Sequence, residues 1–413
     1  MGIPYPLEAV FYRKHLRDLP NWSAYLLAIT FYVATLGYEV LAPLIQILSE
    51  DSNALSIFLR AVVVILCGAC LMFFPKGPKS VSQIFPLYIF LALYTLRIFE
   101  NFYIRQFIWH ADPVVVFGLL IGASAIPVSV LPGIIVYLPD RILMKFQIPV
   151  IGIFLFGLGL NSGSLIAQSQ IGRLSIDKLN PILLGATSLS LALLLFLTPS
   201  RSLLLTVARY GIIATLVGLA AFAQSRGPIV ATGVAILIFG LVARGRHRRY
   251  LIRATIIVVV AGVTASVIYG FNILDIALSR FSSDAGSGLD ASAQGRIAAW
   301  SASWLQFLDG ALIGDRVFEP TLMHYPHNIF LESLISIGIL GTFFLVLHVA
   351  LCVRCSISIF YNEGSSLLSK FLGLIFIKEF IEAQFSGSIW NNNTLWVASA
   401  CLLGAGIGSH RWR

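Results

Sequence analysis

The residues best suited to chemistry lie where the longest polar interruption of the chain, residues 272–325, meets an apolar run. His324 and His327 lie at this junction, and Asn328 and Glu332 open the apolar run. Asn328 and Glu332 are four residues apart, so a helix that begins near His327 puts them on one face. Imidazole has a reference pKa of about 6.5, which suits proton transfer at neutral pH. We therefore predict His327 as a general base, against the alternative of a capping or interfacial histidine. Asn328 and Glu332 are further candidates, and Glu332 can orient a histidine or pair with an arginine. His324 is a second candidate base.

Arginines in nearby polar stretches predict an anion site. Arg226 stands just before Pro228 at the start of an apolar run, where the N–H groups and dipole of a helix N-terminus favour an anion. Arg296 is predicted at the start of an amphipathic helix, where a cation is disfavoured unless it has an anionic partner. Contact with lipid phosphate or solvent is the alternative explanation for both. Two further arginines are weaker candidates for the same site: Arg173 and Arg280.

The composition is that of a membrane protein. Hydrophobic residues make up 58% of the chain and charged residues 11%, whereas a soluble domain carries about 25% charged residues. We predict an all-α polytopic membrane protein, a single membrane domain over residues 1–413, with about 12 transmembrane helices. The predicted spans are roughly 22–44, 54–74, 84–104, 113–137, 147–167, 181–198, 202–222, 228–243, 251–271, 328–352, 366–385 and 394–409.

The basic residues between these runs are unequally divided between the two sides of the predicted bundle. The richer side holds the N-terminus, the arginines of residues 244–253 and the C-terminus, so it is predicted to be cytoplasmic. The net charge of +9 then reflects cytoplasmic loops and not nucleic-acid binding. The opposite, periplasmic side receives residues 272–326 as one large loop between the ninth and tenth spans. His327 is predicted to lie on that side.

The large loop is predicted to contain a short helix. Residues 282–294 are rich in Ser, Ala, Gly and Asp and are typical of a flexible stretch. Ile297, Trp300, Trp304 and Phe307 then recur at helical spacing. They predict an amphipathic helix over residues 295–308 at the membrane surface, where tryptophan is favoured.

Charged residues inside the predicted spans are costly in a membrane and need partners. Lys378 and Glu382 are four residues apart and can pair on one helix face. Local partners explain such charges, but so does a path for protons or ions. A transporter is therefore the alternative from another class. It requires one continuous polar path lined by Glu39, Arg97, Arg209 and Lys378.

Four segments, in order along the chain, resemble signatures of the O-antigen ligase and polymerase family. The last is His327-Asn328, followed after nine residues by Gly338-Ile339-Leu340-Gly341-Thr342. The resemblance covers most of residues 160–345, and a large outer loop between the ninth and tenth of twelve spans agrees with it. The other three segments are Gly172-Arg173-Leu174-Ser175 with Asn180-Pro181, Ser225-Arg226-Gly227, and Gly295-Arg296 with Trp300 and Leu312-Ile313-Gly314.

The resemblance implies an inverting glycosyltransferase of the bacterial inner membrane, with its active site at the periplasmic face. The donor would be a glycan on undecaprenyl diphosphate. The acceptor would be lipid A-core in a ligase of lipopolysaccharide biosynthesis, or a second lipid-linked glycan in a polymerase of surface polysaccharide; the histidine motif favours the ligase slightly. Arg226 and Arg296 would bind the diphosphate, and His327 would take the acceptor proton. Because arginines would stabilise the leaving group, neither a metal nor another cofactor is expected.

Overall fold

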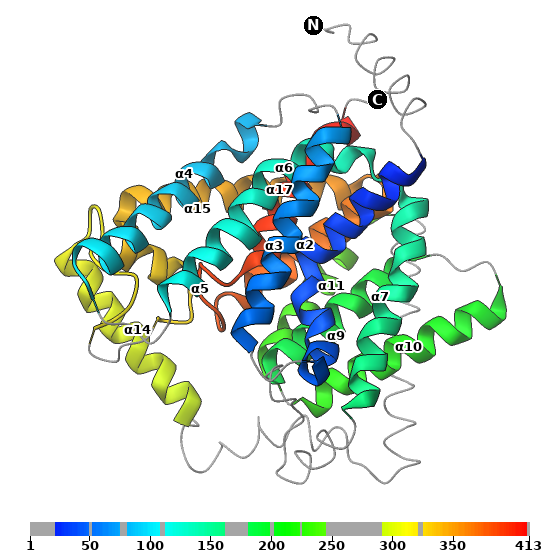
Figure 1. The fold of residues 1–413 in the computed structure, drawn as a ribbon, viewed down its shortest axis with the longest axis horizontal. Helices are drawn as coiled ribbons and strands as arrows, with labels where there is room; N and C mark the ends of the chain where they lie inside the picture. Colours follow the sequence, from blue (N-terminus) through cyan, green and yellow to red (C-terminus); the bar gives the residue numbers. More distant parts are fainter. Residues whose placement is uncertain are drawn as a thin grey trace, which may run out of the picture.

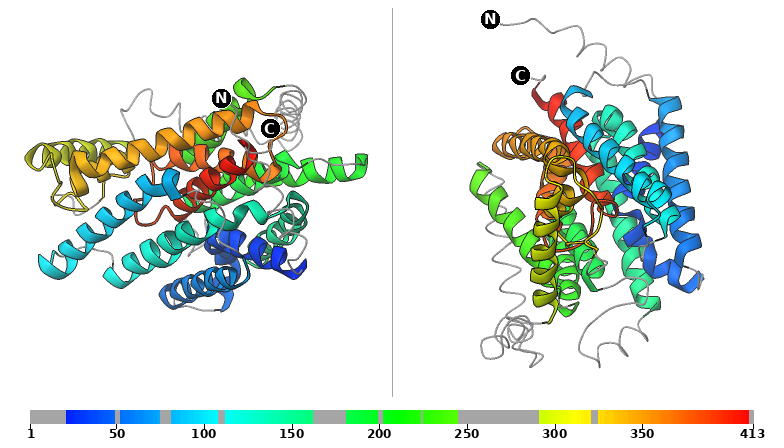
Figure 2. Two further views of the ribbon diagram at one scale, coloured as in Figure 1. Left: turned by 90° about the horizontal axis from the view of Figure 1, so that it is seen from above. Right: turned by 90° about the vertical axis from the view of Figure 1, so that its left-hand side faces the viewer.

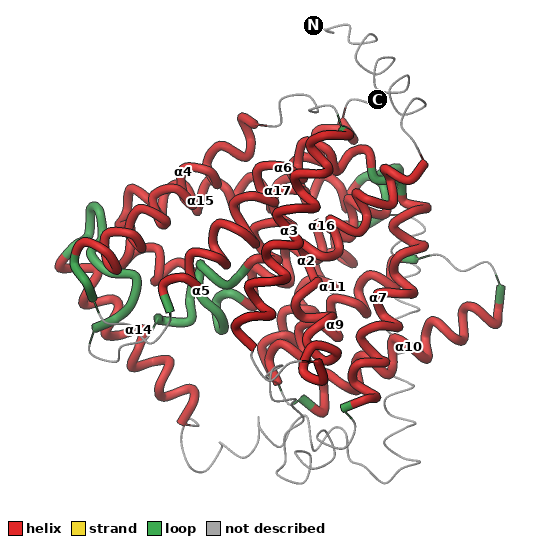
Figure 3. The backbone as a smooth tube through the Cα atoms, in the orientation of Figure 1, coloured by secondary structure: helices red, strands yellow, loops and turns green. Residues whose placement is uncertain are grey.

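The computed structural model describes nine stretches of the chain: residues 21–48, 52–74, 81–107, 112–161, 181–198, 202–223, 225–244, 291–320 and 325–410. The predicted span 251–271, residues 272–290 and 321–324 of the predicted loop, and the candidates Arg173, Arg280 and His324 lie outside them. Within the described stretches every regular element is a helix (Figure 3), which confirms the predicted all-α class.

The helices form one bundle, seen from three directions in Figures 1 and 2. α2 begins and α17 ends near each other at the top of Figure 1. In chain order the elements are α2 (Asn21–Leu48), α3 (Ser52–Phe73), α4 (Val81–Phe99), π-helix η1 (Glu100–Ile104), α5 (Pro113–Phe117), π-helix η2 (Gly118–Ala125), α6 (Ile126–Ile134), 3-10 helix η3 (Ile135–Tyr137), α7 (Asp140–Leu160), α9 (Pro181–Leu197), α10 (Leu203–Phe222), α11 (Arg226–Val242), α14 (Ala291–Asp309), α15 (Ile329–Tyr361), α16 (Leu367–Glu382) and α17 (Asn393–His410).

The predicted spans within the described stretches coincide with helices. The run predicted at 328–352 continues nine residues further, to Tyr361, and for the run predicted at 147–167 α7 begins seven residues earlier, at Asp140. It ends at Leu160 because the amide of Asn161 donates to the carbonyls of Gly157 and Pro43, both at 2.7 Å. By length and composition, six of the described helical segments can cross a membrane. The count of about twelve stays a prediction.

Pro127 and Pro132 lie inside the fourth predicted span, where a proline usually kinks or breaks a helix. The structure keeps it helical from Pro113 to Tyr137, long and apolar enough to cross a membrane. The irregularity precedes the prolines: η2 has π-helical geometry and ends just before Pro127. A π-helical turn widens the hydrogen-bond pattern and accommodates a residue that cannot donate.

α15 consists of two helices joined at Gly338. Gly338 has φ 64° and ψ −166°, far outside the helical region. The hydroxyls of Ser333 and Thr342 are 2.8 Å apart, whereas a straight helix would separate these residues by about 13 Å. The chain therefore reverses direction at Gly338. We call residues 329–337 the short half of α15 and residues 339–361 the long half.

Contacts with α4 give the directions of the two halves. Tyr94 bonds to Glu332, and one turn further along α4 Arg97 bonds to the carbonyl of Ser336. The short half therefore runs parallel to α4, and the long half runs back; α4 and α15 lie side by side in Figure 1. α4 and the short half of α15 finish at the same end of the bundle. We call this end the Gly338 end. The opposite end, where α15 finishes and α7 begins, is the Asp140 end.

The reversal is stabilised by the segment that follows α14. A break in a helix leaves backbone N–H and C=O groups without helical partners. Here the N–H of Asp315 donates to the carbonyl of Ile335 at 2.8 Å, and the N–H of Ile339 donates to the carbonyl of Ala311 at 2.9 Å. Residues 311–316 therefore complete the hydrogen bonding of α15 from outside.

Two glycines make this close approach feasible. Gly314 and Gly338 both have positive φ, 70° and 64°. A Cβ atom on Gly314 would overlap the backbone of Ser336, and a Cβ atom on Gly338 would overlap the carbonyl of Leu312. Any other residue at either position would push the two backbones apart.

Arg97 holds the same junction from α4. Its Nε donates to the carbonyl of Ser336 and one Nη to the carbonyl of Ile313, both at 2.7 Å. Its other Nη pairs with Glu100, one turn further along the chain. The prediction that this charged pair inside a span needs partners is confirmed. The planar guanidinium suits the arrangement because it donates in several fixed directions at once.

Replacing Arg97 with alanine is expected to lower the free energy of unfolding by about 2 to 3 kcal/mol, because carbonyls buried at the junction lose a charged donor. Arg97→Lys should recover only part of this loss, since an ammonium cannot reproduce the fork of the guanidinium. The thermal unfolding midpoint of the purified protein in detergent measures both. Equal midpoints for wild type and Arg97→Ala would contradict the role of the clamp.

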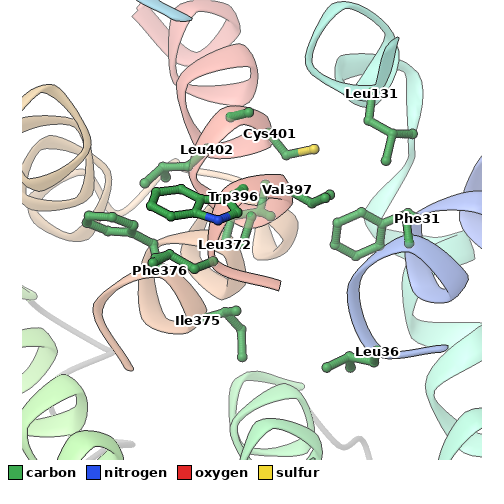
Figure 4. Packing of buried hydrophobic residues seen from close by; sticks show 14 of the residues in the cluster. Phe31, Leu36, Leu131, Leu372, Ile375, Phe376, Trp396, Val397, Cys401 and Leu402 are labelled. Atoms are coloured by element: carbon green, nitrogen blue, oxygen red, sulfur yellow. The ribbon is translucent and has the colours of Figure 1, made fainter. Parts of the chain in front are cut away.

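The apolar core lies between α2, α6, α16 and α17. Trp396 is buried at its centre, close to Phe376 and Leu372 of α16 (Figure 4). The indole nitrogen of Trp396 donates to the carbonyl of Ile389 at 2.8 Å. This bond ties the connection between α16 and α17, residues 383–392, to the core.

Other charges inside the bundle also have local partners. Lys378 lies 2.6 Å from a carboxylate oxygen of Glu379 and 3.1 Å from one of Glu382, so the predicted pairing within α16 is confirmed. Arg209 bonds to the carbonyl of Thr198. These contacts favour the explanation of the charges by local pairing over a continuous polar path.

Candidate functional site

The segment before α15 holds His327 in an unusual backbone conformation. Its φ is 54°, in the left-handed region that few residues other than glycine adopt, although histidine is among those enriched there. The imidazole packs edge-on against the ring of Tyr325, with 4.5 Å between centroids. From α14, the indole of Trp300 donates to the carbonyl of Pro326 at 2.8 Å. Contacts on both sides therefore fix the direction of the His327 side chain.

Asn328 is the N-cap of α15. Its side-chain oxygen accepts from the backbone N–H of Phe330 at 3.0 Å and of Leu331 at 3.1 Å. Its amide nitrogen donates to the carbonyl of Gln384 at 3.4 Å. This corrects the prediction that Asn328 and Glu332 share a helix face: the helix begins one residue later, and Asn328 serves its first turn.

Asn328→Ala is expected to lower the free energy of unfolding by about 1 kcal/mol, the usual loss for an N-cap. Asn328→Asp should recover part of this loss: a carboxylate accepts the same N–H groups and suits the helix dipole, but it cannot donate to the carbonyl of Gln384. Thermal unfolding of the two variants beside wild type measures the difference. A drop as large in Asn328→Asp as in Asn328→Ala would show that capping is not what the residue contributes.

Glu332 is fully buried and accepts three hydrogen bonds. The hydroxyl of Tyr94 in α4 and the hydroxyl of Ser388 donate to its carboxylate, as does the backbone N–H of Ile389 at 3.0 Å. The contacts of Glu332 therefore differ from the arginine or histidine partner predicted from the sequence. The carboxylate connects the short half of α15 to α4 and to the connection between α16 and α17.

Tyr325 lies beside this cluster. Burial raises the pKa of Tyr325 to about 12, and the nearby Glu332 contributes in the same direction, while a hydrogen bond with Asn391 opposes them. The phenol therefore stays protonated at neutral pH. His327 is held against a neutral, buried ring and not against a charge on Tyr325.

Arg226 begins α11, as the sequence predicted for a residue at the mouth of a span. The C-terminal end of α11 packs against the C-terminal end of α15: the guanidinium of Arg244 lies 3.9 Å from the ring centroid of Tyr361. Phe239 and Phe360 also meet there, with 4.8 Å between centroids. With 17 residues, α11 carries Arg226 to about 25 Å from the Asp140 end.

The reversal in α15 brings His327 to a similar depth. The long half extends about 34 Å from the Asp140 end toward the Gly338 end, and the short half extends about 13 Å back. Asn328 therefore lies about 21 Å from the Asp140 end. α16 rises about 24 Å and meets it there, where the N–H of Ile329 donates to the carbonyl of Ala383 at 3.2 Å. α11 packs along α16 and also contacts α15. Arg226 and His327 therefore do not lie at opposite ends of the bundle.

Arg296 lies in the second turn of α14, which begins at Ala291. This corrects the prediction that Arg296 starts the helix, so the argument from the helix dipole does not apply to it. Its nearness to the site follows instead from the spacing along α14. Arg296 stands one turn, or about 6 Å, before Trp300, which contacts Pro326. α14 runs beside the start of α15 in Figure 2.

Tyr94 and Ser388 are site residues that sequence reasoning missed. Both contact Glu332, from 238 and 56 residues away along the chain. No spacing rule relates residues so far apart. The usable signal was Glu332 itself, because a carboxylate in an apolar run has to find donors.

These features define a polytopic helical membrane protein with a buried polar cluster at a break in a membrane helix. Residues 211–346 match the family model described as O-antigen ligase. The match supports an assignment to the O-antigen ligase and polymerase family, in agreement with the motifs. It includes Arg226, Arg296 and His327 but neither Tyr94 nor Ser388. No curated protein matches the chain. The family indicates a glycosyltransferase-like enzyme that acts on lipid-linked glycans in a membrane.

Proposed function

We propose that the protein transfers a glycan from undecaprenyl diphosphate to a hydroxyl of lipid A-core at the periplasmic face of the bacterial inner membrane. It would then act as an O-antigen ligase, with both termini in the cytoplasm. The family match supports the class of reaction. The excess of basic residues on the side of the termini supports the orientation.

The short half of α15 is the observation that carries the proposal. It returns His327 from the Gly338 end to the depth at which Arg226 begins α11. A hydrocarbon core is about 30 Å thick, so a site at about 21 to 25 Å from one end of the bundle lies in the outer part of a bilayer. A donor whose lipid tail stays in that leaflet presents its diphosphate near this level.

Each candidate residue then has a role in the transfer. His327 accepts the proton of the acceptor hydroxyl as the new bond from oxygen to the anomeric carbon forms. The bond from that carbon to the diphosphate oxygen breaks, and Arg226 and Arg296 stabilise the leaving charge. Attack from the side opposite the diphosphate inverts the anomeric centre. Arg173 is proposed as a further diphosphate contact.

The test is transfer by the purified protein in lipid nanodiscs, with undecaprenyl-diphosphate glycan as donor. One sample contains lipid A-core and a second contains no other acceptor. Product only with lipid A-core supports the ligase, and elongated lipid-linked glycan in the second sample supports the polymerase of the same family. Absence of product in both samples would overturn the proposal and favour the transporter.

A further inference from the structure

The face of α14 that packs inward carries polar atoms without partners. The side chain of Ser303 is fully buried, and its hydroxyl has no hydrogen-bond partner among the residues that the structure describes. The amide oxygen and nitrogen of Gln306 are likewise covered and, within the described stretches, unpaired. Ser303 and Gln306 are three residues apart and share one face of the helix.

The opposite face of α14 is apolar and exposed. Ile297, Trp304, Leu305 and Leu308 are 46% to 64% exposed. A helix that only covered the protein from water would turn these residues inward and its polar residues outward. α14 instead exposes these four apolar residues and buries Ser303, although Ala299 and Phe307 also pack inward. This arrangement suits a helix with lipid on its outer side and a polar ligand on its inner side. The predicted apolar face is thus corrected, because only Trp300 and Phe307 of its four residues pack inward.

The position of these polar atoms relates them to the proposed reaction. Ser303 follows Trp300 by three residues, which places it about 4.5 Å further along the helix axis. Trp300 contacts the carbonyl of Pro326, directly before His327. Ser303 therefore lies within about one helical turn of the level of Pro326, and Gln306 within about two. Both stand on the part of α14 that follows Trp300, whereas Arg296 precedes it.

We propose that Ser303 and Gln306 bind the hydroxyls of a sugar ring next to the reacting centre, an inference that rests on the proposed glycan transfer. A serine hydroxyl donates and accepts, and a glutamine amide offers a donor and an acceptor together, which matches neighbouring sugar hydroxyls. Trp300 supplies an aromatic surface on the same side of the helix. Binding requires α14 to move away from the bundle, because the polar atoms of both side chains are covered in this structure. The sugar belongs to the donor glycan or to the acceptor.

The test measures binding of three probes to the full-length protein in nanodiscs by microscale thermophoresis. The probes are undecaprenyl diphosphate without sugar, undecaprenyl-diphosphate glycan from the source cells, and lipid A-core from the same cells. The variants are Ser303→Ala with Gln306→Met, and Ser301→Ala on the exposed face of α14 as the matched control. The double variant should bind one of the two sugar-bearing probes at least ten-fold more weakly, which is about 1.4 kcal/mol. Its affinity for undecaprenyl diphosphate should not change.

The outcomes separate this proposal from the proposed function. The probe that loses affinity identifies the sugar as that of the donor or of the acceptor. Unchanged affinity for both sugar-bearing probes, with wild type binding them, overturns the sugar site alone. Failure of wild type to bind any probe overturns both proposals. The thermal midpoint of the double variant should stay equal or rise, because unpaired buried groups have been removed. A lower midpoint together with unchanged affinity would make the two residues structural.

Discussion

Replacing His327 with asparagine is expected to lower the rate of glycan transfer by a factor of about 10² to 10⁴ while the protein stays folded. Asparagine, like histidine, tolerates the left-handed backbone that this position requires. Its amide cannot accept a proton at neutral pH. The substitution therefore removes the proposed base and keeps the backbone. The rate is measured in a single turnover in nanodiscs, with donor and acceptor both saturating.

Two controls make the His327 result interpretable. His327→Ala also removes the base but places a residue with a Cβ and no polar group at positive φ, so it should be less stable than His327→Asn. The thermal midpoint separates this backbone effect from the loss of chemistry. A His327→Asn enzyme within three-fold of the wild-type rate would eliminate His327 as the base and leave it a positioning role.

Replacing Gly338 with alanine is expected to lower the free energy of unfolding by more than about 4 kcal/mol. The backbone angles of Gly338 are essentially restricted to glycine. A Cβ atom there would also overlap the carbonyl of Leu312, which belongs to the segment that completes the helix. The short half would lose its position, and transfer activity would be lost with it. The yield of monodisperse protein and its thermal midpoint measure the effect.

Gly218 of α10 is the matched control for this substitution. It has a helical neighbourhood, and no atom lies within 4 Å of a Cβ built on it. Gly218→Ala should therefore leave stability equal or raise it by up to about 1 kcal/mol through helix propensity. A Gly338→Ala protein as stable as Gly218→Ala would mean that α15 is not reversed at this glycine.

The helices were predictable because a bilayer imposes one simple rule on sequence. Every backbone group must be paired within an apolar run, so the runs themselves become the helices. For the same reason the break in α15 could not be predicted from its apolar run. The run 328–352 was predicted as one span, in which Gly338 and Gly341 resemble the small residues typical of close helix packing. The signal that distinguishes Gly338 is the pairing of its neighbours with residues 311–316, and this pairing is set by tertiary contact.

Of the candidate site, only the arginines, the glutamate and the histidine could be predicted from the sequence. His327 and Arg226 stand out because their side chains are unusual in such positions. Asn328 was assigned a role near the chemistry, although asparagine before an apolar run is also a typical N-cap. The donors to Glu332 could not be found, since Tyr94 lies in an apolar run and Ser388 in the connection 383–392, and no pattern links either residue to Glu332.

The short half of α15 also has a consequence for the order in which the protein is made. The carboxylate of Glu332 accepts hydrogen bonds from Tyr94 of α4, which is synthesised earlier, and from Ser388, which follows Glu332 by 56 residues. Until Ser388 has left the ribosome, the short half carries a buried acid with incomplete hydrogen bonding, which a membrane disfavours. We expect His327 to reach its working position only after the last helices are inserted. An unfinished chain released into the membrane would then lack the assembled candidate site.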